Sequence, residues 1–210
     1  MSYGAALIES GHESAGLVAG VATATVTRND DEQSLGRVKL NLPWRGKDFE
    51  TDWVRIVTPM AGADRGLFLL PEVGDEVLVA FDRDDIRHPY VLGCLWSDKD
   101  KPPEKNSARK NDIRMLKSRK GHIVKLDDSQ KALIQIQLND GKKIEIDDDG
   151  IRIDDGGNRI TLDSKGGSIA IEAVQSLSLK APKIVVEASA SLDLKGGGSL
   201  NANAGMVRIN

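Results

Sequence analysis

The last ninety residues of the chain, 121–210, repeat one short pattern. Two aliphatic residues separated by one other residue are followed by a few polar residues or glycines, and this recurs in eight steps over the 63 residues from Ile144 to Val207. Alternation within each pair is the period of a β-strand with one buried face. Turn-forming sequences such as Asn139-Asp140-Gly141 fall between the pairs. A fixed short step indicates stacked repeats, and the pattern therefore predicts a β-helix.

One chain alone is a poor β-helix, because a self-sufficient coil needs roughly 20 residues per turn to enclose its own core. Three chains wound about one axis could each supply one side of a triangular prism and cover one another's strand edges. We therefore predict an intertwined triple-stranded β-helix formed by a homotrimer; the alternative is a sandwich or meander of short strands. The pairs Val124/Leu126 and Ile134/Ile136 precede the predicted core, and Val207/Ile209 follows it. The core residues are Ile144, Ile146, Ile151, Ile153, Ile160, Leu162, Ile169, Ile171, Leu177, Leu179, Ile184, Val186, Leu192 and Leu194.

The aromatic residues locate a domain boundary. All eight lie before residue 97, where a globular core needs them, and none lies in the region where a narrow prism has no room for rings. We expect an N-terminal arm at 1–15, an OB-fold domain at 16–97, a polar linker at 98–120 and a β-helical shaft at 121–210. The net charges of residues 1–96, 97–120 and 121–210 are −6, +5 and −2. No domain is basic enough to indicate a nucleic-acid partner.

Five short strands are expected in the N-terminal half, at 17–26, 35–42, 53–58, 75–81 and 90–96, with glycine and proline between them. Five strands in about eighty residues with no helix are typical of a small OB-type barrel. Cys94 lies in the last apolar run and is expected to be a small buried core residue. No signal peptide or membrane span is expected, and synthesis in the cytoplasm follows.

The segment from Trp53 to Trp96, centred on Leu70-Pro71-Glu72-Val73-Gly74-Asp75-Glu76-Val77, resembles the OB-fold domain of contractile-injection spike proteins. These are the VgrG proteins of type VI secretion and the baseplate assembly protein V spikes of contractile phages and phage-derived particles. The family usually has Gly-Asp-Pro after the phenylalanine, whereas this chain has Asp84-Asp85-Ile86, where Asp84 can adopt a left-handed conformation. The motif residues are Trp53, Arg55, Gly62, Leu70, Pro71, Val73, Gly74, Glu76, Val77, Val79, Phe81, Pro89 and Gly93.

The resemblance implies an OB-fold domain followed by a triple-stranded β-helix. It implies a structural, membrane-piercing central spike, made in the bacterial cytoplasm and assembled into the baseplate of a phage tail or phage-tail-like particle. It also implies a homotrimer, a tail hub protein at the OB end and a target cell envelope. The large N-terminal hub portion of VgrG proteins is not recognisable in this sequence, which therefore resembles a stand-alone spike.

No catalytic or cofactor site is expected. His12, His88 and His122 have no metal-ligand spacing, and the acidic clusters 147–149 and 154–155 are interpreted as solvated corners. One alternative is a β-helical enzyme acting on polysaccharide, which would need longer coils and aromatic platforms. Another is a nucleic-acid-binding OB protein with a structural tail. Its candidate surface is Trp44-Arg45-Gly46-Lys47.

The aliphatic alternation continues to Val207 and Ile209, so the last strands are expected to present a partly apolar platform. Such an end usually requires a cap. The resemblance implies a separate tip protein of the PAAR type; the alternative is that the polar residues keep a bare end soluble. The platform residues are Met206, Val207, Arg208, Ile209 and Asn210.

Overall fold

The computed structural model describes residues 18–208, and the chain divides into two compact units between residues 105 and 106. Apart from one short 3-10 helix, every regular element in the described residues is a β-strand, which confirms the predicted all-β class. The expected N-terminal arm, 1–15, lies outside the described residues. The bounds predicted for the arm, the OB-fold domain, the linker and the shaft remain a prediction.

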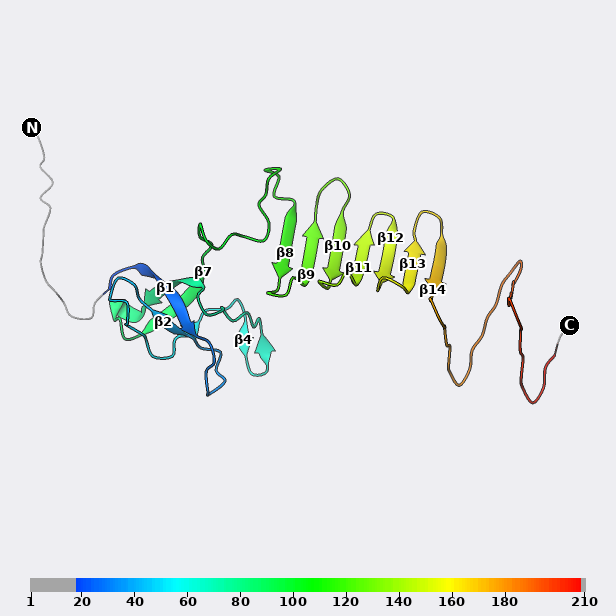
Figure 1. Ribbon diagram of the computed structural model, residues 1–210, viewed down its shortest axis with the longest axis horizontal. Helices are drawn as coiled ribbons and strands as arrows, with labels where there is room; N and C mark the ends of the chain where they lie inside the picture. The colour runs from blue at the N-terminus through cyan, green and yellow to red at the C-terminus, as the bar shows by residue number, and fades with distance from the viewer. Residues whose placement is uncertain (1–17, 209–210) are drawn as a thin grey trace, which may run out of the picture. The chain divides into compact units, whose positions relative to one another are not determined.

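Unit 1 contains a five-stranded sheet in the order β2-β1-β6-β7-β3, of which Figure 1 labels β1, β2 and β7. All neighbours in it are antiparallel except β3 and β7, which are parallel. A bridge between Val38 and Val54 joins the β2 and β3 edges through two backbone hydrogen bonds of 2.7 and 3.0 Å. The sheet thus curls into a barrel of the OB type. Its strands are β1 (Val21–Arg28), β2 (Lys39–Asn41), β3 (Arg55–Ile56), β6 (Glu76–Phe81) and β7 (Pro89–Cys94).

The barrel core is aliphatic. Alternate residues of β6 point inward, with Val77 and Val79 fully buried. A hairpin absent from the sequence prediction, β4 (Ala61–Gly62) with β5 (Arg65–Gly66), forms a separate two-stranded sheet. The 3-10 helix (Asp82–Asp84) connects β6 to β7, and Asp84 has the expected left-handed conformation, with φ 63°. The core residues are Ala24, Val26, Val38, Leu40, Leu42, Val54, Val77, Val79, Phe81, Ile86 and Val91.

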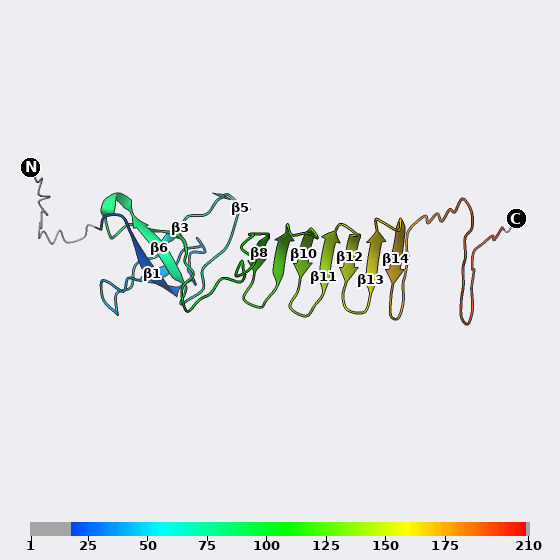
Figure 2. The ribbon, with the colours of Figure 1, turned by 90° about the horizontal axis from the view of Figure 1, so that it is seen from above.

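Unit 2 begins with a seven-stranded antiparallel meander over residues 113–172, which we call the proximal sheet (Figure 2). Each strand pairs with its sequence neighbours, through loops of two to five residues. Strand β8 lies inside the segment expected to be a linker. The strands are β8 (Ile113–Lys117), β9 (Ile123–Asp127), β10 (Leu133–Gln137), β11 (Lys143–Asp147), β12 (Gly150–Asp154), β13 (Arg159–Asp163) and β14 (Ser168–Glu172).

The pairing inside one chain differs from the expectation that neighbouring chains cover every strand edge. Over 113–172 the single chain forms antiparallel strands that are consistent with the predicted β-helix, and the short loops return each strand beside the previous one. Residues 173–208, which we call the distal segment, contain no strand. The shaft expected from one uniform repeat therefore has two parts with different backbone pairing.

Candidate assembly interface

One face of the proximal sheet carries two aliphatic ladders, of which the first crosses all seven strands and the second crosses six. The second and fourth residues of each five-residue strand point to this face, as the spacing of the aliphatic pairs predicts. The first ladder is Leu116, Val124, Ile136, Ile144, Ile153, Ile160 and Ile171. The second is Leu126, Ile134, Ile146, Ile151, Leu162 and Ile169, with Arg114 taking the position on β8.

This aliphatic face is open in the single chain. Its exposed members range from 37% accessible at Ile160 to 72% at Ile169. A soluble protein rarely leaves so long an apolar strip in water, because covering it contributes about 25 cal/mol for each Å² removed from solvent. The strip is therefore a surface that requires a partner.

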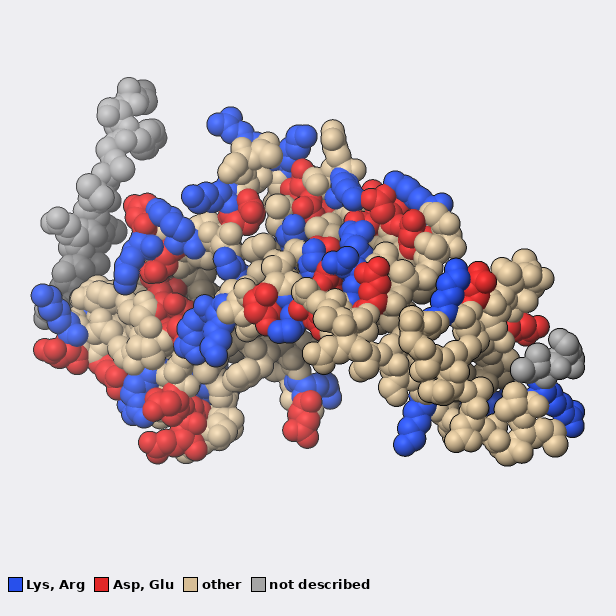
Figure 3. Space-filling view, turned by 45° about the vertical axis from the view of Figure 1, so that its right-hand side comes forward, with Lys and Arg blue, Asp and Glu red and all other residues tan. Residues whose placement is uncertain are grey.

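The opposite face is mainly polar on β11 to β14 and carries Ile113, Met115, Ile123 and Leu133 on β8 to β10. At its centre Gln135 and Glu145 are 9% and 8% exposed, and Gln135 Nε2 donates to Glu145 Oε1 over 2.9 Å. Lys143 Nζ lies 3.0 Å from the other carboxylate oxygen of Glu145, and Arg152 Nε lies 3.5 Å from it. Arg152 also donates to Asp147. Acidic and basic side chains are interspersed on the surface, without a large area of one sign (Figure 3). On β11 to β14 this face needs no partner.

The ion pairs hold several carboxylates in the charged form. The hydrogen bond from Arg152 keeps the pKa of Asp147 well below its usual range. Hydrogen bonds from Lys131 and Lys165 lower the pKa of Asp149. The side chain and backbone of Asn158 lower the pKa of Asp155 to about 2. The polar face is thus a charge-compensated network at neutral pH.

We predict that acid weakens the shaft only below about pH 4. The folded pKa values of these aspartates lie below the unfolded value of about 3.9, so their contribution is complete above that pH and is lost as the pH falls through the folded values. The melting temperature should be level from about pH 7 to 5 and then fall. Asp147→Asn should flatten the acid limb. A fall that is already complete by about pH 5 would contradict the assignment.

The remaining predicted core residues lie in the distal segment and are not brought together within the chain. Leu177, Leu179, Ile184, Val186, Leu192 and Leu194 are all more than half exposed. At the predicted platform, Met206 and Val207 are 70% and 54% exposed, and Arg208 Nε donates to Met206 Sδ over 3.2 Å. Ile209 and Asn210 lie outside the described residues.

The central motif of unit 1 forms the turn into β6. Pro71 is buried, and its carbonyl oxygen accepts a 2.8 Å hydrogen bond from Asn29. Gly74 has φ 98°, which favours glycine, and its N–H donates to Val26 O over 2.8 Å. Asp75 Oδ2 accepts from the Glu72 N–H over 2.9 Å. These residues set the direction of the chain, so the motif specifies the fold of the barrel.

Comparisons with known proteins find matches to this barrel. A family model described as the type VI secretion system/phage-baseplate injector OB domain covers residues 22–96. The type VI secretion system spike protein VgrG2a of Pseudomonas aeruginosa is 38% identical over 72 residues, 32% of this chain and 9% of that protein. Residues 22–96 are thus similar to the OB domain of the VgrG and phage-baseplate spike family.

Other relatives match over a similarly small part of their length. VgrG5 of P. aeruginosa is 34% identical over 94 residues, 41% of this chain and 12% of that protein. The actin cross-linking toxin VgrG1 of Vibrio cholerae is 32% identical over 94 residues, 41% of this chain and 9% of that protein. The chain thus spans about a tenth of the length of these curated relatives. The matched family is one of structural spike proteins.

Most of the other motif residues lie in or beside the barrel. Arg55 donates to the hydroxyl of Tyr90 over 2.8 Å and lies 4.9 Å from its ring centre. Leu70 packs against the core. A Cβ at Gly62 would meet the Arg65 guanidinium at 2.8 Å. Glu76, Pro89 and Gly93 lie on β6 and β7, and Val73 is exposed.

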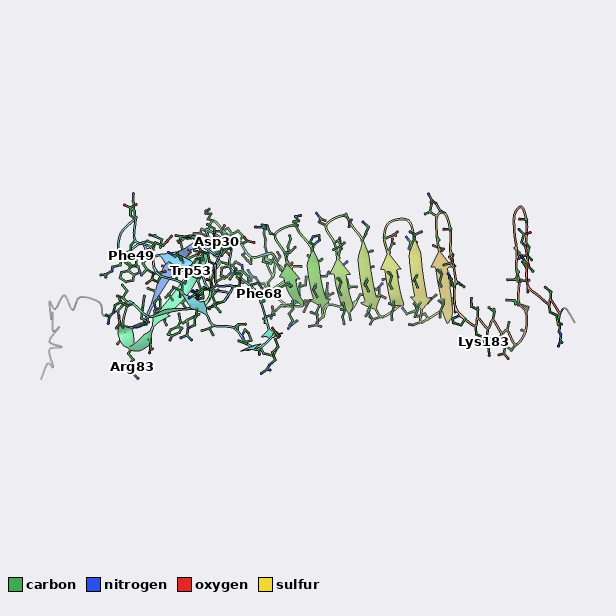
Figure 4. All side chains as sticks on the ribbon, turned by 90° about the horizontal axis from the view of Figure 1, so that it is seen from below. Asp30, Phe49, Trp53, Phe68, Arg83 and Lys183 are labelled. Atoms are coloured by element: carbon green, nitrogen blue, oxygen red, sulfur yellow. The ribbon has the colours of Figure 1, made fainter. Side chains whose placement is uncertain are left out.

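Trp53 is the centre of a cluster that sequence reasoning missed. Arg28, Lys39 and Arg37 lie 5.2, 5.6 and 6.0 Å from its ring centre (Figure 4 labels Trp53). Arg37 makes two 2.8 Å hydrogen bonds to Asp31, and these hold the pKa of that carboxyl well below its usual range. Separate strands and loops supply the residues, so no local motif reveals them.

The Trp53 cluster does not form a cationic nucleic-acid surface. Arg28 is bonded to Asp30 over 2.9 Å, and Lys39 to Glu50 over 3.1 Å, so each of its cations has a carboxylate partner. The cluster is therefore suited to fixing the loop between β1 and β2.

Two residues of the candidate nucleic-acid surface, 44–47, pack against aromatic rings of unit 1. The Trp44 ring packs edge-on against Phe81, with ring centres 6.4 Å apart. Arg45 lies 5.7 Å from the Phe49 ring centre. Lys47 is exposed beside them. These contacts give Trp44 and Arg45 a structural role.

The expectation that Cys94 is buried is wrong, because Cys94 is exposed. A bulge between Leu78 and Val79 leaves Leu92 without an opposing residue and brings Cys94 opposite the buried Val77, so the pairing by itself does not expose Cys94. Cys94 ends that strand, beyond the buried Val91. Partial desolvation of the thiol by neighbouring atoms, together with the Asp75 carboxylate, raises its pKa.

Residues 18–208 contain no group of three His, Cys, Asp or Glu side chains placed to hold a metal ion. None of the elements described there is a helix long and apolar enough to cross a membrane.

Proposed function

We propose that the chain is the central spike of a contractile, phage-tail-like injection particle. One observation carries the proposal: an injector OB domain is followed, in the same chain, by a sheet with two open aliphatic ladders. A domain of this family provides the attachment module, and the repeat provides a shaft. The chain would be made in the bacterial cytoplasm and would join the baseplate.

Three copies would cover the aliphatic face. Three sheets placed edge to edge enclose a triangular core, into which two aliphatic residues per strand project from each side. A closed cyclic trimer buries the face of every copy equally, as would a face-to-face pair, and the likeness to the VgrG spike family favours the trimer. The homotrimer is thus supported by the same ladders that define the shaft.

A mechanical role suits the shaft better than catalysis. Its continuous backbone ladder and charge-compensated outer face resist bending, and no aromatic ring interrupts the narrow core. We infer that the spike is driven through a target cell envelope and is not an enzyme. The force would be transmitted along the strands' stacking direction.

Two further partners belong to the proposal. A tail hub protein would bind the OB unit, which is the part that matches the injector family. A PAAR-type tip protein would seat on the platform residues 206–210, of which Met206 and Val207 present exposed apolar side chains.

Reconstitution with the hub and tip proteins of the same particle tests this function. Native mass spectrometry of the full chain should show a trimer at micromolar concentration, and the trimer should retain both proteins in a pull-down. Removing residues 206–210 should abolish retention of the tip protein and leave the trimer and hub binding intact.

Two outcomes would overturn parts of the proposal. A folded monomer of the full chain at micromolar concentration excludes the shaft as described. Full retention of the tip protein by the shortened chain excludes the platform.

A further inference from the structure

The backbone of unit 2 changes its pairing after Glu172. Up to that residue every strand is hydrogen-bonded to a neighbour in the same chain. The distal segment, 173–208, contains no strand, as its plain trace in Figure 1 shows. Its described residues also make no backbone–backbone hydrogen bond with one another. The aliphatic pairs nevertheless continue: Leu177 to Ile184 is a step of seven residues and Ile184 to Leu192 a step of eight.

The distal segment is exposed in the single chain, so its backbone groups need hydrogen-bonding partners only once its aliphatic residues are buried in an assembly. The alternating pattern of Ile184 and Val186 favours strands over helix. The distal segment of a second copy has the same free donors and acceptors and the same aliphatic step. Identical segments therefore supply what each one lacks, which makes a second copy the natural occupant.

The proximal sheet, 113–172, meets its copies in a different way. Apart from the outer edges of β8 and β14, its backbone is already paired within the chain, so the copies would meet mainly through the side chains of the aliphatic ladders. These contacts do not require any strand to exchange its hydrogen bonds.

A single charged pair marks one end of this interface. Arg114 occupies the ladder position that aliphatic residues hold on the other six strands, and its guanidinium lies 2.6 Å from Asp128. A slip by one strand between copies would place Arg114 against the neighbour's aliphatic ladder, where a desolvated charge is costly. The pair is suited to fixing the register of the copies.

Resting on the trimer of the proposed function, we propose an ordered assembly. The three proximal sheets associate first and set the register. Each distal segment then forms strands by hydrogen bonding to the distal segments of the other copies. In-chain hairpins with loops of two to five residues form before contacts between chains, because closing a short loop costs little entropy.

Pulse-labelling hydrogen exchange during refolding of the wild-type full chain tests this order without any substitution. We expect the amides of 113–172 to gain protection at least about tenfold sooner than those of 173–208. Protection of the distal amides should also depend more strongly on protein concentration. Distal protection that precedes or accompanies proximal protection would overturn the proposal.

Two full-length variants with the same chemical change give an independent test. Ile146→Asp lies in the proximal ladder, whereas Leu192→Asp lies in the distal segment. We expect Ile146→Asp to yield monomers with a distal segment that proteases cleave. Leu192→Asp should stay trimeric, with the proximal sheet protected and the distal segment cleaved.

The opposite asymmetry, or an equal loss of trimer in both variants, would contradict the ordered assembly. These results are distinguishable from failure of the proposed function, because that failure appears already as a monomeric wild type.

Discussion

Ile171→Asp should cost on the order of 5 kcal/mol per trimer, because it places three carboxylates around one dry axis. Ile171 ends the first aliphatic ladder, where it pairs with Ile160 across the last two strands of the proximal sheet. Three like charges in that position can be neither paired nor hydrated. The melting temperature, measured at one fixed protomer concentration, should fall sharply at neutral pH. The deficit should shrink toward pH 4, because a desolvated carboxyl group takes up a proton more readily.

Ala170→Asp is the matched control. Ala170 is the adjacent residue on the same strand, pairs with Thr161 and projects to the polar face. A carboxylate there remains solvated, so the melting temperature should change little. Equal melting temperatures for the two variants would show that the register of the repeat is wrong.

The aliphatic alternation allowed the faces of the shaft strands to be predicted, but not their partners. A spacing of two specifies which side a residue such as Ile146 takes, whichever strand lies beside it. The partner depends on the loop. Only two residues, Asp148 and Asp149, separate β11 from β12, which leaves an antiparallel hairpin as the available connection. A single mean spacing of eight residues between aliphatic pairs does not distinguish the proximal sheet from the distal segment.

The barrel shows the same division between local and long-range information. The turn at Gly74 and the alternation along β6 follow from residues adjacent in sequence, and the motif made them recognisable. The position of Cys94 depends on a bulge in the pairing of β6 with β7, and the Trp53 cluster depends on contacts across three segments. Such features arise from the closed fold and have no sequence pattern of their own.

Gly150→Ala should prevent the proximal sheet from forming its native pairing. Gly150 is buried at the start of β12, opposite Asp163 of β13, and has φ 150°. A Cβ there would lie 1.8 Å from the carbonyl oxygen of Leu162, which belongs to the backbone and cannot move aside without breaking the β12–β13 ladder. The expected loss is at least about 3 kcal/mol per chain from steric overlap and backbone strain together.

Gly156→Ala separates the two causes of this loss. Gly156 also has a positive φ, 94°, but a Cβ there would meet no atom within 4 Å. Its substitution should therefore cost only the backbone strain, about 1 kcal/mol. Chemical denaturation of both full-length variants, followed by the loss of β-sheet circular dichroism, gives the comparison. If Gly150→Ala proves no more harmful than Gly156→Ala, the close approach of β12 to the backbone of β13 is not part of the assembled shaft, and the antiparallel proximal sheet must rearrange when the copies associate.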